Sequence, residues 1–477
     1  MATSFKSLKS VYHREIFALC VIIFMAFFTI YYLHLPPISL AYYAIGFILL
    51  LLLINNPVIA LFTDLIFVFI LVGLSADLYS TWSYKAFTFV SILALIINRI
   101  YKQKDILLGS ASNYILYIGF IVFTLISSMV NQVTGTYNYL LVLLTKFSIV
   151  FLIVNLIGSR RTLMIYFIGF IVVGTINNIV GILQVILGLD WYGFGPRAIG
   201  FLVNPNGVGY LHVLLIPIIF ILMAQTKNKK YRVILMLLFI LCPITAILSQ
   251  SRGALLATFI VMAGVFITSI RNYYMFIMII IVSLLVAVFW QEPYTERFRS
   301  TLERKDILEE SRGYLYRAAV LMIVEHPILG VGPGRFGAEF VASYSARINA
   351  PFKRSFVPHN GYFEVMLTAG IPGMLLILAL IGLWIRRYYR SSKYAKSIND
   401  NELYQLCVLM IISTIGYMIV AAFETLIEAK NFYYYLGLNL AIMNIIAKEK
   451  RDRDIIIKQN TINSSIKTPA PQAFENT

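Results

Sequence analysis

Repeated apolar runs constrain this chain more than any other feature, because about 20 apolar residues in a row can cross a bilayer as an α-helix. We count fourteen such runs, and Asn55-Asn56-Pro57 barely separates the second from the third. They cover residues 15–33, 38–54, 57–76, 84–100, 113–130, 138–157, 163–188, 207–225, 233–250, 253–270, 272–290, 363–386, 404–423 and 431–447. Only 13% of the residues are charged, whereas soluble domains carry about 25%. The sequence therefore predicts an all-α polytopic membrane protein.

The basic residues predict which ends of these runs face the cytoplasm. Of the 39 Lys and Arg residues, 24 lie in the two termini or in connections that follow even-numbered runs. Cytoplasmic connections of membrane proteins are enriched in Lys and Arg, so we expect both termini in the cytoplasm. The net charge of +17 is then a signal of topology, with anionic membrane lipids as a secondary partner. It does not indicate a nucleic-acid partner.

This topology divides the chain into five parts. We predict a cytoplasmic N-terminal tail (1–14), eleven spans (15–290), a long extracytoplasmic loop (291–362), three further spans (363–447) and a disordered cytoplasmic tail (448–477). Two shorter segments, 189–206 and 250–252, also face outward. A loop as long as 291–362 is more often functional than a simple connection.

Two arginines on the predicted outer face are candidates for binding an anion. Arg197 precedes Asn204-Pro205-Asn206 at the start of the eighth span, and Arg252 lies in the short turn before the tenth. A helix start offers backbone amides and a favourable dipole, and a guanidinium group can clamp a phosphate through two hydrogen bonds. The alternative is that both arginines only contact lipid headgroups. The pattern suits a diphosphate held without a metal ion, and we expect neither a metal nor another cofactor.

His359 is the candidate for proton transfer. It lies in a polar context directly before the twelfth span, and histidine titrates near neutral pH. Asn360 and Glu364 are close enough in sequence to orient its ring, although Glu364 is equally explained as a helix-start carboxylate. A structural role for His359 stays open. Histidine within the eighth span, at position 212, is expected to be a buried, hydrogen-bonded core residue.

Together these motifs resemble the O-antigen ligase and polymerase family of bacterial surface-glycan assembly. The resemblance covers about residues 190–385 and rests on these segments: Arg197-Ala-Ile-Gly200, Asn204-Pro205-Asn206, Ser251-Arg252-Gly253, Ser311-Arg312, His326-Pro-Ile-Leu-Gly-Val-Gly332-Pro-Gly334-Arg-Phe336, His359-Asn360-Gly-Tyr362 and Gly370-Ile-Pro-Gly373. Thr368 departs from the pattern, because many members carry an acidic residue there.

The resemblance implies a GT-C-type glycosyltransferase in the bacterial cytoplasmic membrane, with its site facing outward. Such an enzyme takes glycan from an undecaprenyl diphosphate-linked oligosaccharide and transfers it, with inversion and without a metal, to an acceptor glycan. Arg197 and Arg252 would hold the diphosphate and His359 would activate the acceptor hydroxyl. Arg312 would bind the donor or brace the loop, and Asn204, Asn206, Asn360 and Glu364 would support the site. Other surface-polysaccharide assembly proteins are implied as partners.

We expect a polysaccharide polymerase, for teichuronic acid, exopolysaccharide or O-antigen, with an O-antigen-type ligase as the alternative. A transporter or flippase of lipid-linked sugars is the alternative from another class. Transporters place polar residues near the membrane midplane on broken helices, whereas this chain concentrates them in outer connections.

Overall fold

The described residues form helices and no β-strand. A computed structural model describes residues 92–93, 95–99, 111–133, 136–202, 204–268, 307–351, 357–427 and 430–466. Its helices are α7 (Ala111–Val130), α8 (Thr136–Leu156), α9 (Arg160–Ile186), α10 (Gly207–Gln225), α11 (Lys229–Leu248), α12 (Arg252–Thr268), α15 (Ile307–Glu325), α16 (Phe336–Glu339), the π-helical η2 (Phe340–Tyr344), α17 (Ser345–Arg347), α18 (Gly361–Ser397), α19 (Asn401–Ala421) and α20 (Lys430–Ile466).

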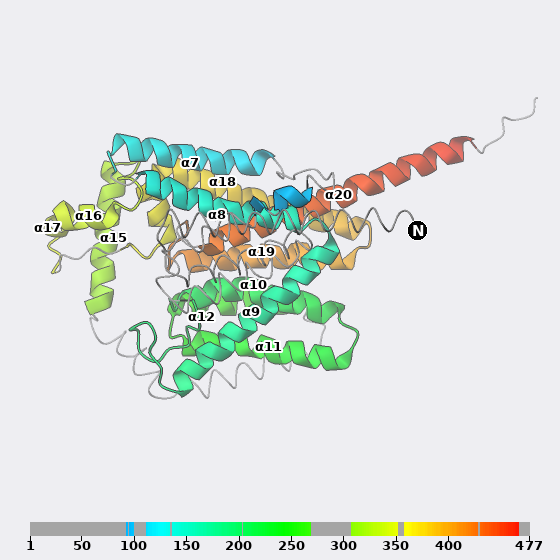
Figure 1. The fold of residues 1–477 in the computed structure, drawn as a ribbon, viewed down its shortest axis with the longest axis horizontal. Coiled ribbons are helices and arrows are strands. Elements are labelled where there is room, and N and C mark those ends of the chain that lie inside the picture. Colours follow the sequence, from blue (N-terminus) through cyan, green and yellow to red (C-terminus); the bar gives the residue numbers. More distant parts are fainter. Residues whose placement is uncertain are drawn as a thin grey trace, which may run out of the picture.

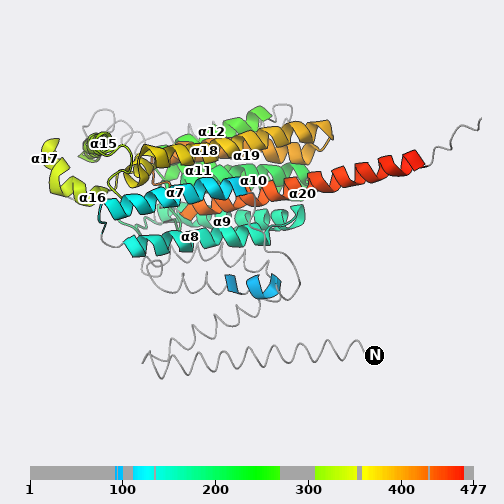
Figure 2. The ribbon, with the colours of Figure 1, turned by 90° about the horizontal axis from the view of Figure 1, so that it is seen from above.

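Most of the long helices lie side by side along one axis of the molecule, whereas α9 crosses them obliquely and α15 stands across one end (Figure 1). Helix α10 packs against α11, α12 and α19, α18 packs against α19 and α7, and α20 packs against α8. Helices α15, α16 and α17 gather at one end, and α20 extends beyond the other (Figure 2). The bundle thus has one end covered by the helices of the outer loop and one end from which α20 projects.

Nine of the predicted spans overlap described helices, from α7 to α12 and from α18 to α20. Five of these helices, α9, α10, α11, α18 and α19, are long and apolar enough to cross a membrane. This supports a multi-pass membrane protein. The first three predicted spans, most of 84–100, and 272–290 lie outside the described residues.

The core contains one polar group that the sequence predicted correctly. His212 of α10 is fully buried, and its ring nitrogens contact Thr258 Oγ1 and Asn178 Oδ1, both at 3.1 Å. Both nitrogens therefore have partners, which removes most of the cost of burying the ring.

Helix α18 is interrupted where the Gly-rich turn of the outer loop, residues 330–334, contacts it. Ala369 and Gly370 have non-helical backbone angles, which leaves the Leu367 carbonyl available. The amides of Val331 and Gly332 donate to that carbonyl at 2.8 and 3.0 Å. The turn thus restores hydrogen bonds that the break removes from the helix.

The opposite end of the bundle is closed by charged side chains. The Arg160 guanidinium at the start of α9 contacts Asp400 and Glu449, both at 2.7 Å. These ion pairs join α9 to the start of α19 and to α20. Arg453 also approaches Asp400, at 3.6 Å.

The predicted disordered tail differs from the structure over its first part, because α20 continues to Ile466. Once a helix has been nucleated, each further residue adds a hydrogen bond at low cost. The extension begins with Lys448, Glu449, Lys450 and Arg451, which are residue types that form helices well. Residues 467–477 lie outside the described part.

The predicted topology can be tested at the two ends of the bundle. Val324 in α15 and Ile456 in α20 are both exposed. In a chain whose three native cysteines are replaced by serine, Val324→Cys should react with an impermeant maleimide in intact cells. Ile456→Cys should react only after permeabilisation. If Ile456→Cys, but not Val324→Cys, were labelled in intact cells, the protein would have the opposite orientation in the membrane.

Candidate active site

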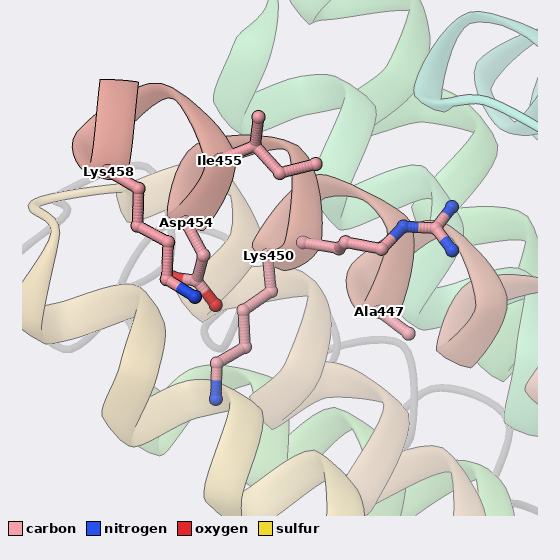
Figure 3. Close-up of a pocket in the computed structure, with 6 residues that line it drawn as sticks. Ala447, Lys450, Asp454, Ile455 and Lys458 are labelled. Carbon is pink, nitrogen blue, oxygen red and sulfur yellow. The ribbon is translucent and has the colours of Figure 1, made fainter. Parts of the chain in front are cut away.

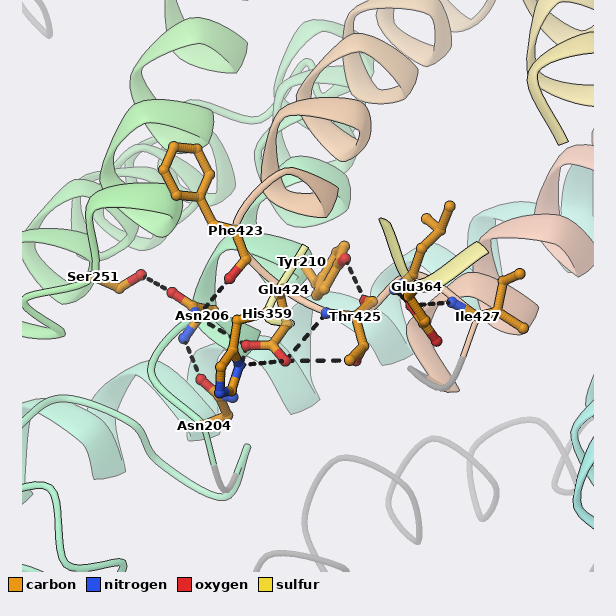
Figure 4. A network of polar contacts seen from close by, with 11 residues as sticks. Asn204, Asn206, Tyr210, Ser251, His359, Glu364, Phe423, Glu424, Thr425 and Ile427 are labelled. Carbon is orange, nitrogen blue, oxygen red and sulfur yellow. Dashed lines mark hydrogen bonds and ion pairs between the residues drawn. The ribbon is translucent and has the colours of Figure 1, made fainter. Parts of the chain in front are cut away.

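The connection between α19 and α20, residues 422–427, is held by side chains from other helices (Figure 4). The Tyr210 hydroxyl of α10 donates to the Thr425 carbonyl at 2.7 Å. The Glu364 carboxylate of α18 accepts the amide of Ile427 at 3.3 Å. The start of α10 and the start of α18 therefore fix this connection.

Glycine at position 361 permits the close contact between the start of α18 and the connection at Leu426. A Cβ there would lie 2.5 Å from the Leu426 Cβ and 2.9 Å from its nitrogen. Any larger residue would push the connection away from α18. The glycine of the His-Asn-Gly-Tyr motif is thus explained by packing.

Glu424 is the central side chain of the connection. Its Oε2 accepts hydrogen bonds from Asn204 Nδ2 at 2.7 Å and Asn206 Nδ2 at 2.8 Å. Asn206 accepts a hydrogen bond from the Ser251 hydroxyl and donates one to the Phe423 carbonyl. The carboxylate is only 11% exposed, and hydrogen bonds to its charged form offset the cost of its burial.

The two candidate arginines lie on neighbouring backbone segments. Ser251 caps α12 by accepting the amide of Ala254 at 3.1 Å, and Arg252 is the first residue of that helix, with an exposed side chain. The amide of Ala198, next to the half-buried Arg197, donates to the Leu248 carbonyl at the end of α11, at 3.0 Å. The backbones at positions 197 and 252 are thus joined through the α11–α12 turn.

Two buried polar residues of α9 hold the segment that follows Arg197. Gln184 Oε1 accepts the amides of Ile199 and Gly200 at 3.1 and 2.8 Å. Asn177 Oδ1 accepts the amide of Phe201 at 2.9 Å. Neither residue was predicted as part of the site, although amide side chains within an apolar span require buried partners.

His359 lies directly before α18 with a positive φ of 46°, a backbone conformation that is uncommon for residues other than glycine. Asn360 caps the helix, because its Oδ1 accepts the amides of Tyr362 and Phe363 at 3.0 and 3.2 Å. His359 Nδ1 lies 4.0 Å from Glu424 Oε1. This separation is longer than a hydrogen bond, and Nδ1 is buried without a hydrogen-bond partner among the described residues.

These contacts differ in part from the expected ones. We expected Asn360 and Glu364 to orient the histidine ring. Asn360 instead fixes the backbone beside it, and Glu424 rather than Glu364 faces Nδ1. Asn204 and Asn206, expected as support, reach the ring indirectly by holding Glu424.

Burial, the largest effect, lowers the pKa of His359 below its usual value. The negative charge of Glu424 opposes this shift, and the positive charge of Arg312 adds to it. Arg312, in α15, is therefore electrostatically coupled to the ring. A lowered pKa keeps the imidazole neutral near pH 7, which is the form that can accept a proton.

The start of α10 does not offer the anion site that we expected. The amides of Gly207, Val208 and Gly209 donate to carbonyls of the preceding turn at 2.9 to 3.3 Å. Two of these carbonyls belong to Asn204 and Asn206. This tight turn satisfies amides that an ordinary helix start would leave open.

A cavity of about 360 Å³ adjoins His359 on the side of the outer loop. Its walls come from the Gly-rich turn, α16, the segment before α18, α18 itself and the α19–α20 connection. Gly332, Gly334, Phe336, Gly337, Val357, Pro358, His359, Glu364, Leu367, Thr368 and Thr425 line it.

A second hollow, on the C-terminal part of α20, is not a comparable site. Its lining residues, including Lys450, Asp454 and Lys458, all belong to that one helix (Figure 3). Within the described part of the chain no other element contributes to its walls. A depression along one helix offers a ligand little enclosure.

Glu424 is the site residue that sequence reasoning missed, although a signal was present. The predicted topology places the end of the thirteenth span on the same side as His359. A carboxylate directly after that span therefore belonged with the outward polar residues. Glu424 was nevertheless not predicted, because the connection between the thirteenth and fourteenth spans was not counted among the outward segments.

Charge substitutions around His359 should move its pKa in opposite directions. Glu424→Gln removes a negative charge and should lower the pKa, whereas Arg312→Gln removes a positive charge and should raise it. NMR titration of histidine-labelled protein measures both, with His359→Ala to assign the signal. Glu402→Gln, at the far end of the bundle, is the control. An unchanged pKa in both site variants would contradict this arrangement.

One comparison with known proteins gives a match. Residues 234–378 match a family model described as O-antigen ligase. The matched region contains Arg252, Arg312 and His359, whereas Arg197 precedes it and Glu424 follows it. A search of curated proteins gives no significant match. The matched region and the apolar helices around it support assigning the chain to the O-antigen ligase and polymerase family.

Proposed function

We propose that this protein transfers glycan from an undecaprenyl diphosphate-linked donor to a sugar hydroxyl at the outer face of the cytoplasmic membrane. The observation that carries the proposal is the position of His359. The ring lines a cavity, and its Nδ1 lies 4.0 Å from the carboxylate of Glu424. That carboxylate is held by hydrogen bonds from Asn204 and Asn206. A family match to O-antigen ligase over residues 234–378 supports the same class of reaction.

The reaction requires a base and a means of stabilising the leaving group. The acceptor oxygen forms a bond to the anomeric carbon, and its proton passes to His359. The bond between that carbon and the diphosphate oxygen breaks, and its electron pair leaves with undecaprenyl diphosphate. Attack opposite the leaving group inverts the anomeric carbon.

Glu424 would serve His359 as a positioning residue. Its charge favours the imidazolium that forms when the ring takes the acceptor proton. The two asparagine amides keep the carboxylate in place during that change. Glu424 thus acts through the ring and not on the substrate.

Arg197 and Arg252 would bind the diphosphate. Their backbones are joined through the α11–α12 turn, where Ser251 donates a hydrogen bond to Asn206. Preorganised guanidinium groups stabilise the negative charge that develops on the leaving group. We propose that these two charges serve where other transferases use a metal ion.

Replacing either arginine tests the donor site. Arg197→Ala or Arg252→Ala should reduce transfer by about 10²–10³-fold, with normal membrane insertion. Lysine should restore little, because a point charge cannot replace a bidentate fork. Arg390→Ala, exposed near the far end of α18, is the control. Full activity of both alanine variants in nanodiscs with lipid-linked donor would exclude this role.

Replacing the histidine tests the base. His359→Ala should lower the transfer rate by about 10²–10⁴-fold while donor binding remains. Wild-type activity should fall as the pH drops through the His359 pKa, because protonation removes the base. Loss of donor binding together with turnover would indicate a structural role instead. Loss of activity on addition of a chelator would contradict metal-independent transfer.

Polymerase is the form of the activity that we propose. A strain that lacks the protein should then accumulate lipid-linked single repeat units. Accumulation of full-length lipid-linked polymer would identify a ligase instead. Mass spectrometry of the extracted lipid-linked oligosaccharides distinguishes the two.

A further inference from the structure

We propose that the 360 Å³ cavity beside His359 is the acceptor subsite and binds an uncharged, hydroxyl-rich sugar unit. This inference rests on the proposed function and assigns the two substrates to different sides of the histidine. The donor diphosphate lies on the side of Arg197 and Arg252, and the acceptor sugar lies on the side of the outer loop.

The chemistry of the lining favours a neutral ligand. No lysine or arginine is among the described residues that line the cavity, so the lining offers no ammonium or guanidinium group to a diphosphate. Phe336, Val357 and Leu367 provide apolar surface, and the Thr368 and Thr425 side chains add hydroxyl groups. Mostly apolar walls with a few placed polar groups are typical of small-molecule sites, and a sugar presents both kinds of surface.

The basic residue nearest in sequence is engaged elsewhere. Arg335 forms an ion pair with Glu339 at 2.6 Å and donates to the Asn131 carbonyl at 2.5 Å. It thereby links the Gly-rich turn to the end of α7 and does not line the cavity. A site for the diphosphate would more readily use such a guanidinium group.

The wall of the cavity is firmly built. The turn donates two backbone hydrogen bonds to the Leu367 carbonyl, and Asn131 Nδ2 donates to the Gly330 carbonyl at 3.2 Å. A Cβ at Gly330 would lie 2.3 Å from the Leu367 oxygen, so the turn and α18 are in direct backbone contact. A preformed site loses less free energy on ordering when it binds its ligand.

The size of the cavity sets the extent of the ligand. A volume of 360 Å³ lies near the lower end of the range of about 300–1,000 Å³ for small-molecule sites. It suits the terminal part of a glycan, with the remaining sugars outside. His359, on the cavity wall, can then accept the proton of the attacking hydroxyl, while Glu424 lies beside its Nδ1.

The test fills the mouth of the cavity and separates the two substrates. Val357 lines the cavity and is 42% exposed, so Val357→Trp should fold and obstruct the site. Val324→Trp, at an exposed position of α15 that does not line the cavity, is the matched control. The donor is the lipid-linked oligosaccharide of the producing cells, and the acceptor probe is the oligosaccharide released from it by mild acid.

Val357→Trp should raise the acceptor KM by about tenfold, the loss expected from poorer fit in a pocket, without changing the donor KM. Thr368→Val, which keeps the side-chain volume and removes the hydroxyl, should shift the acceptor KM in the same direction. The His359 NMR titration should be unchanged in Val357→Trp, which shows that the ring has not moved. An increase in the donor KM alone, or no change in either, would overturn the proposal.

Binding of the released oligosaccharide decides the question independently of catalysis. Saturation-transfer NMR in nanodiscs should detect it with wild-type protein, Val324→Trp and Arg252→Ala, and should lose it with Val357→Trp. Loss with Arg252→Ala but not with Val357→Trp would place the sugar on the donor side. If wild-type protein binds the oligosaccharide here but transfers nothing, the proposed function fails and the subsite remains.

Discussion

The hydrogen bonds from Asn204 and Asn206 to Glu424 are the interactions on which the site depends. They join the start of α10 to the end of α19, helices that are more than 200 positions apart in sequence at these contacts. A carboxylate with 11% exposure is costly to bury without partners that favour its charged form. Because Ser251 in turn donates to Asn206, the start of α12 is fixed by the same network. Loss of either asparagine would therefore disturb the carboxylate beside His359 and the helix start that carries Arg252.

The two ends of the bundle are held by different chemistry, which explains why one end can carry a site. The end at Arg160 is closed by full ion pairs with Asp400 and Glu449. The end at His359 uses neutral amides to hold its carboxylate, so the charge of Glu424 is not cancelled by a close cation among its described hydrogen-bond partners. That charge can act on the histidine ring. Between the ends, His212 has neutral partners for both ring nitrogens and contributes to the core.

The sequence predicted many elements of this site because local rules govern them. Apolar length and basic residues predicted the helices from α7 to α12 and from α18 to α20, and His359 stood out as a histidine at a helix start. The helix break at Gly370 and the contact of α18 with the Gly-rich turn were not predicted. The contact joins a backbone carbonyl to backbone amides about 36 residues away, and because every residue except proline has both groups, no side chain signals it. The role of Asn360 was missed for a related reason, since an asparagine before a helix can cap it or support a neighbour equally well.

By itself the sequence determined the class of molecule and the presence of the apolar helices α7 to α12 and α18 to α20. It also singled out the side chains that we propose to transfer a proton or hold a diphosphate. These follow from hydrophobic length and side-chain chemistry, which are properties of single segments. Only the tertiary structure decided that Glu424, and not Glu364, faces His359, and that Gln184 and Asn177 hold the segment after Arg197. It also decided that the Gly-rich turn forms one wall of a cavity. Each of these depends on which helix ends meet, and that is set by packing between segments distant in the chain, which no local pattern records.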